Sequence, residues 1–236
     1  MLLCDFHIHT TYSDGALPLS RVVDLFGRSG HDVIAITDHI VNSDNPLGKI
    51  AHATGRTLTR ESWKRYSDEI RKEAERAWKT WRMIVIPGAE LTRNSFHRDT
   101  SAHVLALGLE EFLPADGDPI QMLREIRAHG AVSVACHPHE TSELFANTWY
   151  LWNRRPALGD LVDLWEVGNR WELFPVVSRE ILPHCANSDF HRPEHLYAWK
   201  TLVKAERSAS DVLRALRRGT GIGVLRLTPD VAAASA

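Results

Sequence analysis

The sequence predicts an α/β fold with a mostly parallel sheet that closes, or nearly closes, into a barrel. Two observations predict it: short apolar runs alternate with amphipathic helical segments, and seven such runs are present. Residues that can bind metals follow most of the runs, as expected at the carboxyl ends of parallel strands. A doubly wound open sheet is the alternative that the same alternation allows.

The seven apolar runs read as strands because aliphatic and β-branched residues dominate them and they are too short for buried helices. The last run has the least strand-like composition. The runs are Leu2–Phe6, Val33–Ile36, Met83–Ile86, His103–Leu107, Ala131–Ala135, Leu161–Val167 and His184–Ala186.

Helical spacing of apolar residues marks the segments between several runs. Glycines close three of these segments and serve as stop signals. The predicted helices are Leu17–Arg28, Leu58–Arg82, Pro119–His129 and Ser210–Arg218. The region from Trp199 to Leu227 is expected to supply a closing strand and helix, and the alanine-rich residues 231–236 are expected to fray. We expect residues 1–236 to form a single domain.

The composition is that of an ordinary soluble protein. Of the 236 residues, 44% are hydrophobic and 25% are charged, and the formal net charge is −2. Because the basic residues form no long run, neither a nucleic-acid duplex nor an anionic membrane is an expected partner. No apolar stretch approaches the roughly 20 residues of a membrane span. The oligomeric state stays open.

The amino terminus and the cysteines indicate a cytoplasmic protein. No charged leader with an apolar segment precedes His7, so no signal peptide is expected. Three cysteines (Cys4, Cys136 and Cys185) form no CxxC pair and are an odd number, which disfavours a disulfide framework. A reducing cytoplasm is therefore the expected location.

The first group of candidate ligands follows the first predicted strand. His7 and His9 are two residues apart, so on a strand they point to the same face and can bind one ion. Asp5 has the same parity and could orient a ligand. Asp14 precedes Gly15 in a predicted turn that brings a carboxylate back toward the strand end.

Similar residues follow the later runs, and each is weak evidence by itself. Their recurrence at independent strand ends indicates a metal site, and mixed imidazole and carboxylate ligands suit zinc, manganese or iron. His103 opens its run and by itself reads as structural, and Cys136 reads as a small buried strand residue rather than a thiolate ligand. The candidates are Asp38, His39, Glu90, His103, His137, His139, Asp189 and His191.

These motifs, in this order, resemble the PHP (polymerase and histidinol phosphatase) superfamily over Leu3 to Pro193. The matching stretches are His7-Ile-His9, Ser13-Asp14-Gly15, Thr37-Asp38-His39, Gly88-Ala89-Glu90, His103, His137-Pro138 and Ser188-Asp189-Phe190-His191. The resemblance implies a distorted seven-stranded, TIM-like β/α barrel that holds two or three divalent metal ions (Mn, Zn or Fe).

The resemblance also implies which residues bind each ion. His7, His9, Glu90 and Asp189 would bind the first, and Glu90 would bridge to a second ion held by His103 and His137. Asp14, His39 and His191 would bind a third, although some family members have a histidine where this chain has Asp14. Glu90, Asp189 and His191 would be central to catalysis.

The implied activity is hydrolysis of a small anionic phosphate ester, a monoester or diester of nucleotide-like or sugar-phosphate character. A hydroxide bridging two ions roughly 3.5–4 Å apart would attack phosphorus in line. Arg170, Arg192 and Arg93 could contact the phosphate, and His139 could contact substrate. The alternatives are a histidinol-phosphatase-like activity, hydrolysis of a non-phosphate ester or amide, and a non-catalytic metal-binding module.

Overall fold

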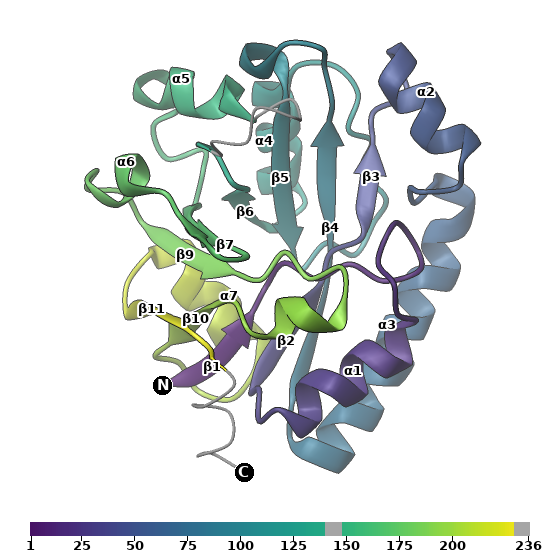
Figure 1. Cartoon of the computed structure of the whole chain (residues 1–236), viewed down its shortest axis with the longest axis vertical. Helices are drawn as coiled ribbons and strands as arrows, with labels where there is room; N and C mark the ends of the chain where they lie inside the picture. The colour runs from purple at the N-terminus through teal and green to yellow at the C-terminus, as the bar shows by residue number, and fades with distance from the viewer. Residues whose placement is uncertain (140–147, 229–236) are drawn as a thin grey trace.

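Strands and helices alternate along the chain, and the strands hydrogen-bond into one sheet (Figure 1). The computed structural model describes residues 1–139 and 148–228, so the prediction for residues 231–236 lies outside the described residues. The strands are β1 (Leu2–Asp5), β2 (Val33–Ile36), β3 (His39–Val41), β4 (Ile84–Arg93), β5 (Ala102–Leu107), β6 (Val132–Ala135), β7 (Leu164–Asn169), β8 (Glu172–Leu173), β9 (His184–Asn187), β10 (Trp199–Val203) and β11 (Ile222–Arg226). The helices are α1 (Leu19–Arg28), α2 (Pro46–Ala53), α3 (Arg60–Trp81), α4 (Pro119–Ala128), α5 (Trp149–Leu158), α6 (Pro175–Ser178) and α7 (Ala209–Arg218).

The order of the strands corrects the expectation of a mostly parallel sheet. The hydrogen-bonded order is β11-β10-β1-β2-β4-β5-β6-β7-β8, with β3 paired to β4 and β9 paired to β7. Strands β1, β2 and β4 are parallel, but β5 is antiparallel to both β4 and β6. A seven-stranded TIM-like barrel is therefore not confirmed, because this nine-strand order is open and its directions are mixed.

The direction of β5 follows from the short connection that precedes it. A parallel partner of β4 would need a crossover of a dozen or more residues. Residues 94–101 contain only a 3-10 turn (Arg98–Thr100), which is enough to reverse the chain. Strand β5 therefore returns antiparallel, in register from Gly88 with Leu107 to Arg93 with Ala102.

The sheet curls until the segments that follow β1 and β9 meet. Ile8 and Phe190 form an isolated parallel bridge. The His9 N–H donates to the Phe190 carbonyl at 2.8 Å, and the Phe190 N–H donates to the His7 carbonyl at 2.9 Å. This contact places the residues after β1 beside those after β9, although the two segments are far apart in the sequence.

Apolar residues pack against both faces of the sheet, as alternation along buried strands requires. In β2, Ile34 and Ile36 belong to one buried cluster, whereas Val33 and Ala35 belong to another. The first cluster includes residues of α1, α3, α4 and α5, and the second includes residues of α7. Figure 1 shows α1 and α3 side by side along one flank of the sheet.

The four predicted helices are confirmed, with ends that move by no more than two residues. Strand β4 is longer than predicted: it continues past Pro87 to Arg93, pairing first with β2 and then with β3. Strands β3, β8 and β11 and helices α2, α5 and α6 were not predicted. Among the described helices, none combines the length and apolar character needed to cross a membrane.

Candidate metal centre

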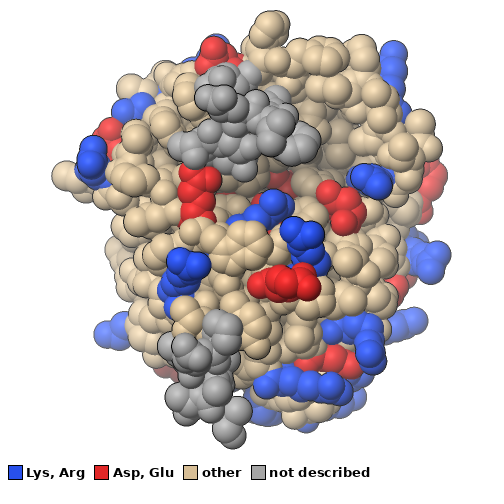
Figure 2. Space-filling model, in the orientation of Figure 1, with Lys and Arg blue, Asp and Glu red and all other residues tan. Residues whose placement is uncertain are grey.

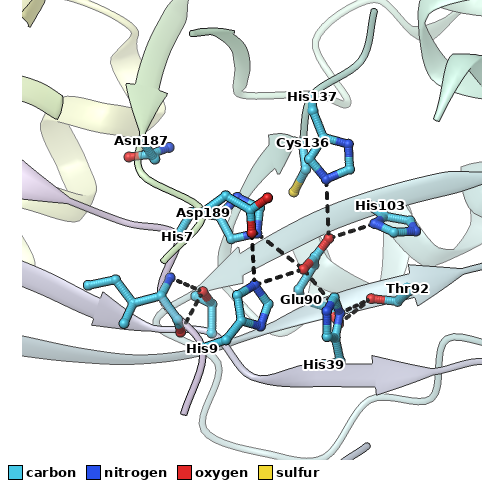
Figure 3. A network of polar contacts seen from close by, with 12 residues as sticks. His7, His9, His39, Glu90, Thr92, His103, Cys136, His137, Asn187 and Asp189 are labelled. Carbon is cyan, nitrogen blue, oxygen red and sulfur yellow. Dashed lines mark hydrogen bonds and ion pairs between the residues drawn. The ribbon is translucent and has the colours of Figure 1, made fainter. Parts of the chain in front are cut away.

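Side chains from separate strands converge at one rim of the sheet (Figure 3). His7 and His9 follow β1, and Glu90 lies within β4. His103 is the second residue of β5, and it reaches this rim because an antiparallel strand places its amino end beside the carboxyl ends of its neighbours. His137 follows β6 by two residues, and Asp189 follows β9 by two residues.

Glu90 is the centre of the cluster, and Figure 3 shows histidines on several sides of its carboxylate. Its Oε2 lies 3.1 Å from His7 Nε2, 3.3 Å from His9 Nε2 and 3.1 Å from His39 Nδ1. Its Oε1 lies 2.8 Å from His103 Nδ1 and 3.8 Å from the Nε2 of His137. Each oxygen thus faces a different set of imidazoles, which is the arrangement that a bridging carboxylate requires.

Asp14 gathers a second set of imidazoles. Its Oδ1 lies 3.2 Å from His191 Nε2, 3.6 Å from His39 Nε2 and 3.9 Å from His9 Nδ1. Asp189 Oδ1 lies between the two sets, 3.4 Å from the Nε2 atoms of both His7 and His9.

Grouping by possible ligand atoms gives sets that could each hold a metal ion, with all atoms of a set within 4.8 Å of one another. Eight of the nine predicted ligands fall into these sets. The ninth, Asp189, belongs to none of them but lies 3.4 Å from both His7 and His9. The sets are His9-Asp14-His39-His191, His7-His9-Glu90, Glu90-His103-His137 and His7-Cys136-Glu166.

Outer polar partners fix the orientation of several histidine rings. Thr92 Oγ1 lies 2.7 Å from His39 Nδ1, and Asn94 Oδ1 lies 3.0 Å from His103 Nε2. Thr148 Oγ1 lies 3.3 Å from the Nδ1 of His137. Partners of this kind set the tautomer of a metal-binding histidine.

The carboxylates of the cluster are held ionised. Burial raises the pKa of Glu90, but the nearby His39 and His7 outweigh burial and leave that pKa well below its ordinary value. Burial also raises the pKa of Asp189, and His7 and His191 together lower it well below its usual range.

Two of the histidines, His7 and His9, show the matching effect. Burial lowers the pKa of His7, but Asp189 and Glu166 reverse this and raise it well above its ordinary value. For His9, the nearby carboxylates of Asp189 and Glu90 outweigh burial and raise the pKa to about 9. Positive charge beside the carboxylates is therefore stabilised, and a divalent cation can supply that charge in place of protons on the imidazoles.

Buried atoms without hydrogen-bond partners test whether this donor set fits a cation. His9 is fully buried, yet neither of its ring nitrogens has a hydrogen-bond partner among the described residues. The same holds for Glu90 Oε1 and His103 Nδ1, which face each other. Buried polar atoms normally have partners, so ligand atoms aimed at shared points fit metal coordination.

The backbone is strained at the rim of the cluster. Four described non-glycine residues have positive φ, and three of them belong to this region: His137 (27°), Arg170 (49°) and Asp189 (47°). Such conformations cost of order 1–3 kcal/mol each and persist where the surroundings over-determine them.

A cavity of about 510 Å³ opens onto the cluster. Its lining consists of Asp14, His39, Leu47, Glu90, Asn94, His103, His137, Arg170, Asp189 and His191. Arg170 is the arginine of this lining, and its guanidinium lies 2.9 Å from Asp189 Oδ2. On the face drawn in Figure 2, basic and acidic side chains are interspersed.

The other predicted substrate contacts do not line this cavity. Arg93 binds Asp44 through two contacts of 3.0 and 2.8 Å. Arg192 is 63% exposed, and its Nε lies 4.0 Å from Glu194. His139 stacks on Trp149, with ring centroids 5.0 Å apart.

The structure also assigns places to residues around the ligands. Asp5 accepts the N–H groups of His7 (3.4 Å) and Ser188 (3.2 Å), which agrees with its predicted orienting place. Its other oxygen pairs with the fully buried Lys200 at 3.0 Å. Cys136 is buried, and burial raises the pKa of its thiol well above the ordinary value.

Sequence reasoning missed Glu166, Asn94, Thr92, Thr148 and Lys200. Glu166 stands in an otherwise apolar strand, and that charge inside a buried run was a usable signal. The others carry no signal in the sequence, because their contacts depend on how the strands pair.

The profile of the PHP domain family matches residues 5–123, which is half of the 236-residue chain. The chain belongs to the PHP domain family. The matched range contains six of the nine clustered ligands, from His7 to His103, while His137, Asp189 and His191 lie beyond it and complete the cluster in space.

The chain is also similar to part of a curated phosphodiesterase. A phosphoribosyl 1,2-cyclic phosphate 1,2-diphosphodiesterase from Eggerthella lenta is 27% identical over 111 residues, which are 47% of this chain and 32% of that enzyme. The chain thus matches about a third of the length of this curated relative.

Two solved structures share the fold. One is a two-domain protein from Bacteroides vulgatus that contains a predicted PHP-like metal-dependent phosphoesterase; its TM-score is 0.69 at 24% identity, over 96% of this chain and 65% of that one. The other is an amidohydrolase from Chromobacterium violaceum with bound sulfate and no metal; its TM-score is 0.51 at 14% identity, over 96% of this chain and 92% of that one.

Proposed function

We propose that this protein is a metal-dependent phosphoesterase that hydrolyses small phosphorylated compounds. The observation that carries the proposal is the convergence of imidazoles from separate strands on the two oxygens of Glu90, beside a cavity that Arg170 lines. Family membership supports it, as does the phosphodiesterase named among the relatives.

The proposed ligand sets follow the distances in the cluster. His7, His9, Glu90 and Asp189 would hold one ion, and Glu90 would share a second with His103 and His137. Asp14, His39 and His191 would hold a third. Manganese, zinc and iron all suit such imidazole and carboxylate ligands. When bound, divalent ions would supply activation of water and stabilisation of charge on the phosphate.

The protein's own groups would bind and orient the substrate. The Arg170 guanidinium can donate to a phosphate oxygen while Asp189 holds it at the cavity wall at 2.9 Å. Asn94 lines the cavity and could donate through its amide N–H₂ group. The volume of about 510 Å³ suits a small molecule rather than a polymer.

We also retain the cytoplasm as the proposed location. The three cysteines are free and buried, which is compatible with a reducing compartment.

A panel of phosphomonoesters, cyclic and linear phosphodiesters, carboxylic esters and amides, assayed with Mn²⁺, Zn²⁺ or Fe²⁺, tests the proposal. We expect turnover of phosphate esters, and we expect Glu90→Gln to lower kcat/KM by at least about 100-fold. The matched control Asp68→Asn alters an exposed carboxylate on α3 and should leave the rate unchanged.

The same panel separates the alternatives. Turnover of amides or carboxylic esters alone would assign the other hydrolase class. No turnover with any ion, in protein that binds the ions, would identify a binding module.

A further inference from the structure

Glu166 is a buried carboxylate of β7 that the ligand sets proposed above leave unused. It is fully buried, and each of its oxygens contacts two N–H donors. Oε1 lies 3.0 Å from His7 Nδ1 and 2.9 Å from Asn187 Nδ2. Oε2 lies 2.8 Å from the backbone nitrogen of His137 and 2.9 Å from Asn169 Nδ2.

Because all its acceptor sites are occupied, Glu166 is suited to orient other groups and not to bind a cation itself. A carboxylate offers about four acceptor sites, and four N–H groups occupy them here. The alternative set His7-Cys136-Glu166 would break these bonds and would require the buried Cys136 thiol to ionise. Glu166 therefore acts as a hydrogen-bond acceptor for its neighbours and has no free oxygen lone pair for a cation.

The contact with His7 decides which ring nitrogen can face an ion. With Nδ1–H donating to Glu166, the lone pair of the neutral ring is on Nε2. That Nε2 points at Glu90 Oε2 (3.1 Å) and Asp189 Oδ1 (3.4 Å), the carboxylates with which it would share an ion.

The same carboxylate constrains a second predicted ligand. The His137 N–H that donates to Glu166 belongs to a residue with φ of 27°, a conformation that few side chains adopt without support. Glu166 thus connects the loop after β6 with the residues after β1, and the two ligands face different oxygens of Glu90.

We propose that Glu166 is the positioning residue of the metal centre: it holds His7 in the tautomer that leaves Nε2 free and fixes the backbone at His137. The inference rests on the proposed function only in requiring that the cluster binds divalent ions. Its test therefore measures ion binding and tautomer state, and catalysis is not needed.

The test compares Glu166→Gln with Asp163→Asn in the full chain. A glutamine presents one oxygen and one N–H₂ group, so it can keep the bonds of only one side. Asp163 lies just before β7 at the far end of the strand and accepts from Ser133 N at 2.8 Å, which makes it a control for loss of a strand-end carboxylate. Affinities for Mn²⁺ and Zn²⁺ are measured by calorimetry, and His7 is followed by ¹⁵N NMR in the Zn²⁺-loaded protein.

We expect Glu166→Gln to weaken ion binding by about 10–100-fold, which is the usual effect of losing such an outer partner. The His7 spectrum should lose the Nδ1–H tautomer where the glutamine turns its N–H₂ group toward His7 and keep it where the oxygen does, whereas Asp163→Asn should change neither the ion affinity nor the His7 spectrum. Unchanged affinity in Glu166→Gln, or an equal loss in both variants, would overturn the inference.

The wild-type protein gives an independent answer if Glu166→Gln does not fold. A His7 ring that carries its proton on Nε2 in the Zn²⁺-loaded wild type would overturn the inference by itself. If phosphate esters are not hydrolysed but Glu166 controls ion affinity and the His7 tautomer, the proposed function fails and the positioning role stands.

Discussion

At the scale of single residues, the buried histidines of this protein fall into two electrostatic classes. His7 and His9 lie among carboxylates, which raise the pKa of each ring. His31 is also buried, but its charged neighbour is Lys200, so burial and that charge lower its pKa to about 3. The same residue type thus stabilises the fold over opposite pH ranges.

His31 should make the stability of the protein fall with acid. It is 2% exposed and packs edge-on against Phe26, with ring centroids 4.8 Å apart. Because its pKa is lowered in the folded protein, its contribution is complete above about pH 6.5 and is lost as the pH falls toward 3. We expect the free energy of unfolding of the wild type to drop more steeply than that of His31→Leu between about pH 6 and 4, by about 1.4 kcal/mol per pH unit.

Urea denaturation at several pH values measures this difference. His97→Leu removes an exposed histidine and should keep the pH dependence of the wild type. Parallel curves for the wild type and His31→Leu would show that His31 is protonated equally in both states.

Some residues of the site could be predicted from their neighbours in the sequence, and others could not. His7, His9 and Asp189 could be predicted because their spacing and strand-end positions are visible in the sequence. His103 read as structural when taken alone, since it opens its strand, and only the reversed direction of β5 brings it to Glu90. Lys200 was unpredictable, because its partner Asp5 lies on another strand of the sheet.

At the scale of elements, helix α1 packs against α3 where Gly27 meets the Trp81 ring. A Cβ on Gly27 would overlap with that ring. In an exposed helix, replacing glycine by alanine stabilises by about 1 kcal/mol. Here overpacking should reverse the sign, so we expect Gly27→Ala to lower the free energy of unfolding by about 1–3 kcal/mol, measured by chemical denaturation.

A double-mutant cycle isolates the cause of that loss. In a Trp81→Leu background, Gly27→Ala should cost much less or become stabilising, because the obstructing ring is gone. An equal cost in both backgrounds would place the strain elsewhere in α1.

Helices with a long apolar periodicity were predicted correctly, whereas the direction of a strand that follows a short chain reversal was not. Helix α3 has twenty-two residues and a capping box between Thr59 and Ser62, and its limits were predicted closely. Helix α5 contains Pro156, has weak amphipathic character and was missed. The prediction of a parallel strand was wrong at β5, because the composition of a strand does not indicate its direction. The short connection of residues 94–101 does indicate it, since it is too short for a parallel crossover.

At the scale of the whole molecule, the candidate ligands couple ion binding to global folding. They come from β3, β4, β5 and the segments after β1, β6 and β9, so only the folded chain brings them together. A ligand that binds only the folded state stabilises it by about 2.7 kcal/mol when its concentration is 100 times Kd. We expect Mn²⁺ to raise the Tm of the wild type and a chelator to reverse the effect.

The stabilisation by Mn²⁺ should increase with pH, because the histidines of the cluster must lose their protons to bind the ion. Because the pKa values of His7 and His9 are raised, protons compete with the ion, and the rise in Tm should be smaller at pH 6 than at pH 8. Glu90→Gln should lose the response, since both of its oxygens face histidines that would share an ion. His97→Leu should keep the response. A wild-type Tm indifferent to Mn²⁺, or an equal rise in Glu90→Gln, would show that the cluster is held by its own ion pairs and does not bind the cation.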